Sequence, residues 1–189
     1  MLRKTILITF VAIMLIFPVS TFAQQSPSTT SDERLSKAVA EQQLTLSDSE
    51  KQTLSDKCQA AQKQLIAIKS KTDKVVQLRV STYSTIQKEL QAIKLRMARQ
   101  GVDASEIDLL IGKIQQSLDK LTISADDYGL ALKDIISLDC GQKPEQFMAG
   151  LIIVRAQQAI LLDSARQLTA TLESANNGTF NQLKKRLTV

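Results

Sequence analysis

Residues 107–135 read IDLLIGKIQQSLDKLTISADDYGLALKDI, and this stretch decides the fold. Its apolar or small side chains recur in alternating steps of four and three residues. They are Ile107, Ile111, Ile114, Leu118, Leu121, Ala125, Tyr128, Leu132 and Ile135. Steps of this size place all of them on one side of an α-helix, as in the seam of a coiled coil or long bundle. The stretch therefore predicts a helix over about 103–140 that needs a partner along its whole length.

A second long helix is predicted upstream, over about 47–100. Ser47 and Glu50 form a capping-box pattern, in which each side chain accepts a hydrogen bond from an unpaired backbone N–H. No Gly or Pro occurs from there to Gln100, and Gly101 then breaks the pattern. The apolar stripe comprises Leu54, Cys58, Ala61, Leu65, Ile68, Val76, Val80, Tyr83, Ile86, Leu90, Ile93 and Met97. This stripe can cover the seam of residues 107–135 if the chain folds back at Gly101.

A third helix is predicted over about 144–176. Pro144 suits the first helical position, where its missing N–H does no harm. Asn177 and Gly178 are typical of a helix stop. The apolar positions between them form a broad face, which indicates contact with both other helices.

The two cysteines, Cys58 and Cys140, fit this arrangement. Residue 99 lies midway between them in the sequence, and the break at Gly101 is two residues further on. Folding back at Gly101 therefore brings the two sulfur atoms together at the far end of the hairpin. We expect a disulfide rather than a redox pair or metal site, because the chain has no His and no Cys-x-x-Cys spacing. The predicted fold is all-α: an elongated, coiled-coil-like, up-down-up antiparallel three-helix bundle with one disulfide.

The N-terminal 23 residues have the three parts of a signal peptide. Arg3 and Lys4 supply positive charge, a largely apolar run of twelve residues follows up to Phe17, and Ala23 suits cleavage. An uncleaved membrane anchor is the alternative, but the run is short of the about 20 residues that span a bilayer. We expect export from a bacterial cell, to the periplasm, the cell surface or the medium. Residues 24–46 are predicted to be a flexible polar linker with a weak helical pattern over 32–43.

Composition excludes several classes of protein. Only six Gly and three Pro occur among 189 residues, too few turn residues for a β-sandwich or barrel. The net charge of +5 is not concentrated in one strong patch, so nucleic acid is not an expected partner. With no His, the usual general base and the commonest metal ligand are missing. We therefore expect no enzyme, no catalytic residue, no cofactor and no metal.

Five charged residues are candidates for polar contacts between helices. Counting back from the turns places Arg79 at the level of Asp119 and Asp163, and Arg155 near Asp126. Such contacts would be partly buried ion pairs that fix the register. A ligand pocket near Arg155 is one alternative. The other, which the pattern favours, is that the arginine stems cover apolar surface and their charges stay in water.

Two glycines and the C-terminal tail complete the sequence-based expectations. Gly112 and Gly129 lie inside the predicted second helix, at positions where a neighbouring helix could pack closely. The tail, residues 179–189, carries the basic run Lys184-Lys185-Arg186. Weak contact with an anionic membrane or cell-wall polymer is one interpretation of it. A frayed or weakly docked terminus is the simpler interpretation.

These observations predict an exported, non-enzymatic helical bundle. Its expected role is a structural spacer, an adaptor or a module that binds an unknown envelope or extracellular protein. The alternatives are a bundle that senses or carries a small molecule, a holdase-like periplasmic chaperone, and a secreted effector that acts on membranes. The sequence specifies no oligomeric state.

Overall fold

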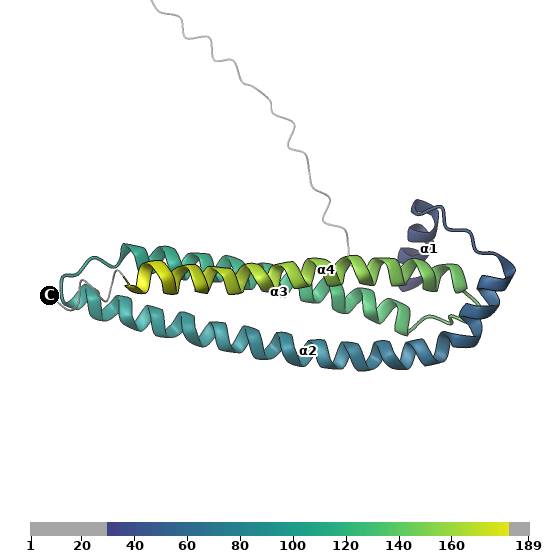
Figure 1. Cartoon of the computed structure of the whole chain (residues 1–189), viewed down its shortest axis with the longest axis horizontal. Coiled ribbons are helices and arrows are strands. Elements are labelled where there is room, and N and C mark those ends of the chain that lie inside the picture. Colours follow the sequence, from purple (N-terminus) through teal and green to yellow (C-terminus); the bar gives the residue numbers. More distant parts are fainter. Residues whose placement is uncertain (1–29, 182–189) are drawn as a thin grey trace, which may run out of the picture.

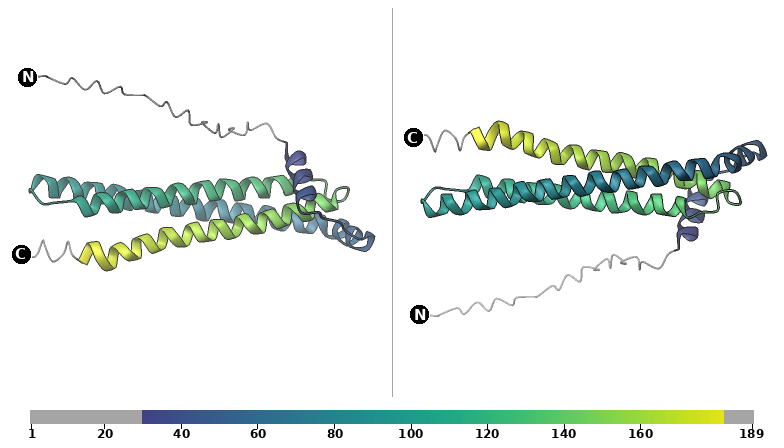
Figure 2. Two further views of the ribbon diagram at one scale, coloured as in Figure 1. Left: turned by 90° about the horizontal axis from the view of Figure 1, so that it is seen from above. Right: turned by 90° about the horizontal axis from the view of Figure 1, so that it is seen from below.

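Four α-helices and one π-helical turn make up the part of the chain that the computed structural model describes, residues 30–181 (Figure 1). They are α1 (Ser31–Glu41), α2 (Asp48–Arg99), α3 (Ser105–Ile136), α4 (Pro144–Ala175) and the π-helical turn η1 (Asn176–Phe180). The helices α2, α3 and α4 form a long rod in which α3 runs antiparallel to α2 and α4, and α1 crosses one end of it (Figure 2). The predicted signal peptide and the basic run of the tail lie outside the described residues.

The predicted three-helix bundle is not confirmed, because the described residues contain four helices. The additional helix, α1, lies within the segment 24–46, where the sequence predicts a linker with a weak helical pattern over 32–43. Its first turn is held by a capping box: Thr30 Oγ1 accepts from Glu33 N at 3.3 Å, and Glu33 Oε2 accepts from Thr30 N at 2.9 Å. Leu35 and Ala38 share one side of α1 and are both buried. Local capping and an apolar face together make this short helix part of the fold.

The helix α2 has 52 residues and is therefore about 78 Å long at about 1.5 Å per residue. The capping box predicted at its start is present, with Ser47 Oγ accepting from Glu50 N at 3.4 Å. Hydrogen bonds from the side chain and backbone of Ser47 lower the pKa of Glu50. The turn after α2 depends on Gly101, whose φ of +69° lies in the left-handed region that favours glycine.

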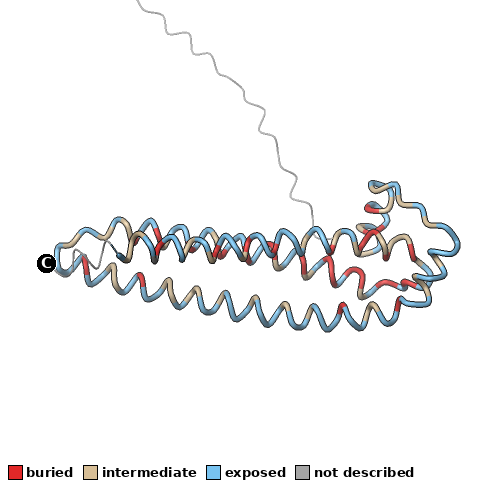
Figure 3. The backbone as a smooth tube through the Cα atoms, viewed as in Figure 1, coloured by how far each residue is buried: buried red, intermediate tan, exposed pale blue. Residues whose placement is uncertain are grey.

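The core of the rod lies along α3. The predicted seam is largely buried, and Ile107, Ile114, Leu132 and Ile135 have no exposed surface at all. The helix α3 packs against both α2 and α4, whereas α2 and α4 touch each other in few places. Figure 3 shows the consequence, since buried residues concentrate on α3 and α4 while most of α2 is exposed. The central helix therefore carries most of the apolar packing.

The helix α4 begins at Pro144 and ends at Ala175, close to the predicted 144–176, but the helical path does not stop at Gly178. The helical path continues through η1 to Phe180, and Gly178 has no positive φ. The combined helix Pro144–Phe180 is long and apolar enough to cross a membrane by length and composition alone. About a third of its most apolar window is buried inside the bundle, and the core helix of a soluble protein passes the same test.

Among the glycines of the described helices, Gly150 lies closest to a neighbouring helix, whereas Gly112 and Gly129 lie in open space. A Cβ atom added to Gly150 would overlap Cγ2 of Ile135 and lie 3.1 Å from Cδ2 of Leu35. At Gly112 and Gly129 the same atom would meet nothing within 4 Å. Gly150 is therefore the position where α4 contacts both α3 and α1 through its bare backbone.

This contrast predicts opposite effects for two identical substitutions. Gly150→Ala should lower the free energy of unfolding by about 1–3 kcal/mol, because the added methyl overpacks the junction with Ile135. Gly129→Ala should raise the free energy of unfolding by about 0.5–1 kcal/mol, because alanine favours a helix interior and the site is open. Urea unfolding followed by circular dichroism measures both. Equal effects of the two substitutions would contradict the close approach at Gly150.

Candidate functional site

The disulfide predicted from the sequence joins Cys58 of α2 to Cys140, four residues past the end of α3. The two Cα atoms are 5.8 Å apart, within the usual range for a disulfide. Both cysteines are buried, at 4% and 1% exposure. The bond links α2 to the loop between α3 and α4, at the end of the rod opposite Gly101.

A glutamine side chain completes this end of the rod. The amide Nε2 of Gln62, one turn after Cys58, donates to the carbonyls of Ile135 and Ile136 at 3.2 Å and of Leu138 at 2.7 Å. The last carbonyls of a helix have no partner within the helix. Gln62 therefore satisfies carbonyl groups that α3 leaves unpaired. The helix α3 ends at Ile136, four residues earlier than the predicted end at residue 140.

The helix α1 is attached to the rod by a bidentate ion pair. Arg34 donates to Asp134 from Nε at 2.8 Å and from Nη2 at 2.6 Å, and Ser31 Oγ adds a third bond to the same carboxylate at 2.7 Å. The Asp134 side chain is only 7% exposed, whereas that of Arg34 is 34% exposed. The hydrogen bond to Asp134 is the main reason that the pKa of Arg34 is raised. Removing either partner would leave this buried carboxylate without its full set of hydrogen bonds, at a cost in stability.

Further polar contacts surround the same end. Lys143 Nζ lies 2.7 Å from Asp32 Oδ2, which ties the α3–α4 loop to α1. Lys51 Nζ lies 2.8 Å from Glu145 Oε1, which ties the start of α2 to the start of α4. That bond raises the pKa of Lys51 and lowers the pKa of Glu145. All four helices are therefore joined within one region.

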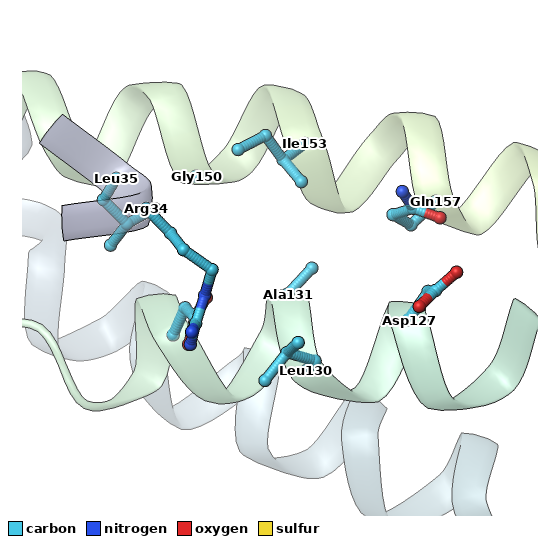
Figure 4. A pocket seen from close by; sticks show the side chains of 9 residues that line it. Arg34, Leu35, Asp127, Leu130, Ala131, Gly150, Ile153 and Gln157 are labelled. Atoms are coloured by element: carbon cyan, nitrogen blue, oxygen red, sulfur yellow. The ribbon is translucent and has the colours of Figure 1, made fainter. Parts of the chain in front are cut away.

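A cavity of about 250 Å³ lies beside the ion pair, between α1, α3 and α4 (Figure 4). Its walls include Leu35, Leu130, Ala131, Gly150 and Ile153. Arg34 reaches across from α1 toward α3 at one end, and Asp127 and Gln157 point toward each other at the other end (Figure 4). Because Arg34 is engaged by Asp134, this cavity offers no free cation to an incoming ligand.

The five residues proposed for contacts between helices do not form them. Among the described residues, no ion pair within 4 Å joins Arg79 or Arg155 to Asp119, Asp126 or Asp163. All five side chains are exposed. Asp119 accepts from Gln115 at 2.8 Å, and Asp163 accepts from Gln167 at 2.7 Å, each within its own helix.

Arg79 instead borders a cavity of about 220 Å³ where α2 and α4 separate. Val75 and Val76 of α2, Leu121 and Tyr128 of α3, and Leu161, Leu162 and Ala165 of α4 supply its apolar walls. Lys71, Thr72 and Gln158 complete the lining. The sequence pattern identified Arg79 as unusual but not the separation of α2 from α4 that opens the space beside it.

A larger groove of about 500 Å³ lies between α3 and α4 near the Gly101 end. Small side chains dominate its floor, among them Ser117, Ala170, Ser174 and Ala175. Leu109 stands at the groove with 67% of its surface exposed. We call this feature the tip groove.

Residues 30–181 contain no group of three or more Cys, Asp or Glu residues placed to hold a metal ion. Comparisons with protein-family models, with curated proteins and with solved structures found no match.

Opening the disulfide should destabilise the rod strongly. The chain-entropy treatment of the loop between Cys58 and Cys140 gives up to about 4.5 kcal/mol, and typical measured losses are about 2–4 kcal/mol. The double variant Cys58→Ser/Cys140→Ser should therefore lower the free energy of unfolding by about 2–4 kcal/mol. Denaturant unfolding under non-reducing conditions measures this, with reduced wild type as the matched control. An unchanged midpoint would contradict a stabilising role for the disulfide.

Breaking the ion pair of α1 should release that helix. Arg34→Met leaves the Asp134 carboxylate buried beside Ser31 alone, and we expect a loss of about 2 kcal/mol. This is below the about 3–5 kcal/mol for a fully buried pair, since Arg34 is about a third exposed. Hydrogen exchange should show α1 losing protection before the rod unfolds. Lys37→Met, which removes an exposed pair with Glu41, should change little. Equal exchange in both variants would contradict the anchoring role of Arg34.

Proposed function

We propose that the chain is an exported, non-enzymatic helical rod that acts as a spacer and as an adaptor for a partner protein in the cell envelope or outside the cell. The proposal is supported by the difference between the two ends of the rod. One end is fastened by the disulfide, by Gln62 and by the ion pairs around α1. The other end has the Gly101 turn and the Lys94–Asp108 ion pair between α2 and α3, and it carries the tip groove. A rod with one end fixed by several bonds and a groove at its other end suits a role between two attachment points.

The tip groove is the observation that carries the adaptor role. Its floor of small side chains would let another helix approach closely, and the exposed Leu109 offers an apolar contact at its edge. Partner surfaces combine apolar contacts with polar groups around them. Glu106, Lys113 and Gln167 supply polar groups around the groove. We therefore place the partner-binding surface at the tip rather than along α2.

Site-specific photocrosslinking in the native cell tests this proposal. A photoreactive phenylalanine analogue at Leu109 of the full chain should yield one discrete adduct with another protein. The same analogue at the exposed Lys57, near the disulfide end, is the positional control and should not yield that adduct. Ala170→Arg, which fills the groove floor, should abolish the adduct from position 109. No adduct at Leu109, or the same adduct from Lys57, would overturn the proposal.

A further inference from the structure

The cavity beside Arg79 has the charge pattern of an anion-binding site. Its only charged lining residues are the cations Lys71 and Arg79, and no carboxylate lines it. Neither cation has an ion-pair partner within 4 Å among the described residues. A cleft lined by one sign of charge and walled by apolar groups concentrates the opposite charge. The walls therefore favour an anion that also carries an apolar part.

A hydroxyl that lines the cavity and has no protein partner is the second observation. Tyr128 is only 3% exposed and lines the cavity, yet its hydroxyl makes no hydrogen bond to any described residue. The hydroxyl oxygen is not among the buried atoms that lack a partner, so it is accessible from the open part of the cavity. Burial raises the pKa of Tyr128, so the hydroxyl keeps its proton at neutral pH and can donate it to an acceptor. A ligand oxygen would satisfy this group.

The antiparallel arrangement places Lys71, Tyr128 and Gln158 at one end of the cavity and Arg79 at the other. Among the lining residues of their helices, Lys71, Tyr128 and Gln158 are those nearest the disulfide end. A cation, a hydroxyl and an amide are thus contributed by three helices at a similar level. Toward the Gly101 end the walls from α3 and α4 are Leu121, Leu162 and Ala165, all apolar, and α2 contributes the exposed Arg79.

The size of the cavity limits the ligand to a single chain. Its volume of about 220 Å³ is below the range of about 300–1,000 Å³ for drug-sized ligands. The lining of α2 from Lys71 to Arg79 spans about 12 Å, the length of an extended alkyl chain of about ten carbons. Beyond Arg79, the contact of the Tyr83 hydroxyl with Thr169 Oγ1 at 3.5 Å bridges α2 and α4. Val75 and Leu162, at 46% and 51% exposure, leave apolar surface for the chain to cover.

We propose that this cavity binds a single-chain anionic amphiphile, a medium-chain fatty acid or its equivalent. The head group lies against Lys71, Tyr128 and Gln158, and the alkyl chain runs between α2 and α4 toward Ala165. This site is separate from the tip groove, so the carrier role and the adaptor role can fail independently.

Isothermal titration calorimetry of the full-length, oxidised chain with sodium decanoate tests the proposal. We expect saturable binding of one equivalent below the micellar concentration. Octanoate should bind more weakly, by about two- to fourfold for each methylene removed. Decyltrimethylammonium, which has the same chain length but a cationic head, should bind at least about tenfold more weakly, because it meets Lys71 and Arg79.

Variants of the lining locate the site. Tyr128→Phe should weaken decanoate binding by about tenfold, since it removes one hydrogen bond to a charged group. Lys71→Glu should weaken it by about tenfold or more, and Leu162→Asp should abolish it. Lys88→Glu is the matched control, because Lys88 is an exposed cation of α2 outside the cavity lining, and it should leave the dissociation constant unchanged. Thermal melts confirm that each variant is folded.

Three results would overturn the proposal. One is the absence of saturable decanoate binding to the wild type. The second is binding that Tyr128→Phe and Lys71→Glu leave unchanged, and the third is equally tight binding of the cationic amphiphile. Tyr128→Phe keeps the aromatic ring in the core, so it decides the question even if Leu162→Asp fails to fold.

Discussion

Burial of the apolar side of α3 is the constraint on which the rest of this structure depends. The apolar face of α3 is wide enough that it must be buried on two sides. The helix α2 covers one side and α4 covers the other. Because the two outer helices are held by α3 rather than by each other, they can diverge along part of the rod. The same constraint therefore explains both the stability of the bundle and the space that opens between α2 and α4.

Much of the rod could be predicted from local sequence. Helix periodicity identified the seam of residues 107–135, Ser47 and Glu50 marked the start of α2, and the cysteine spacing about Gly101 predicted the disulfide. These signals depend on side chains a few residues apart or on simple hairpin symmetry. Sequence alone could therefore give an all-helical, disulfide-linked fold with long antiparallel helices.

The remainder depended on contacts between positions far apart in the sequence. Thr30 and Glu33 do form a capping pattern that marks the start of α1. What attaches α1 to the rod, however, is the ion pair of Arg34 with Asp134, which lies 100 residues away in the sequence. In the sequence, nothing distinguishes Gly150 from any other glycine in an apolar helix. Its importance follows from the contact with Ile135 of α3. Counting residues from the turns placed Arg79 near Asp119 and Asp163, but it could not show that both carboxylates face away to solvent. Register along a rod is predictable from sequence, whereas rotation of each helix about its axis is set by packing.

The positions of the first and last described residues have a mechanical consequence. The chain enters the rod through α1 beside the disulfide and leaves it through η1 near the Gly101 turn, so its entry and exit lie at opposite ends (Figure 2). Tension between two attachments would run parallel to α4 and load its interface with α3 in shear. In shear, the side chains along the whole interface must separate together, whereas peeling would part them one turn at a time. Resistance to such a force is governed by the barrier to unfolding rather than by equilibrium stability, and the long contact between α3 and α4 is oriented to raise that barrier.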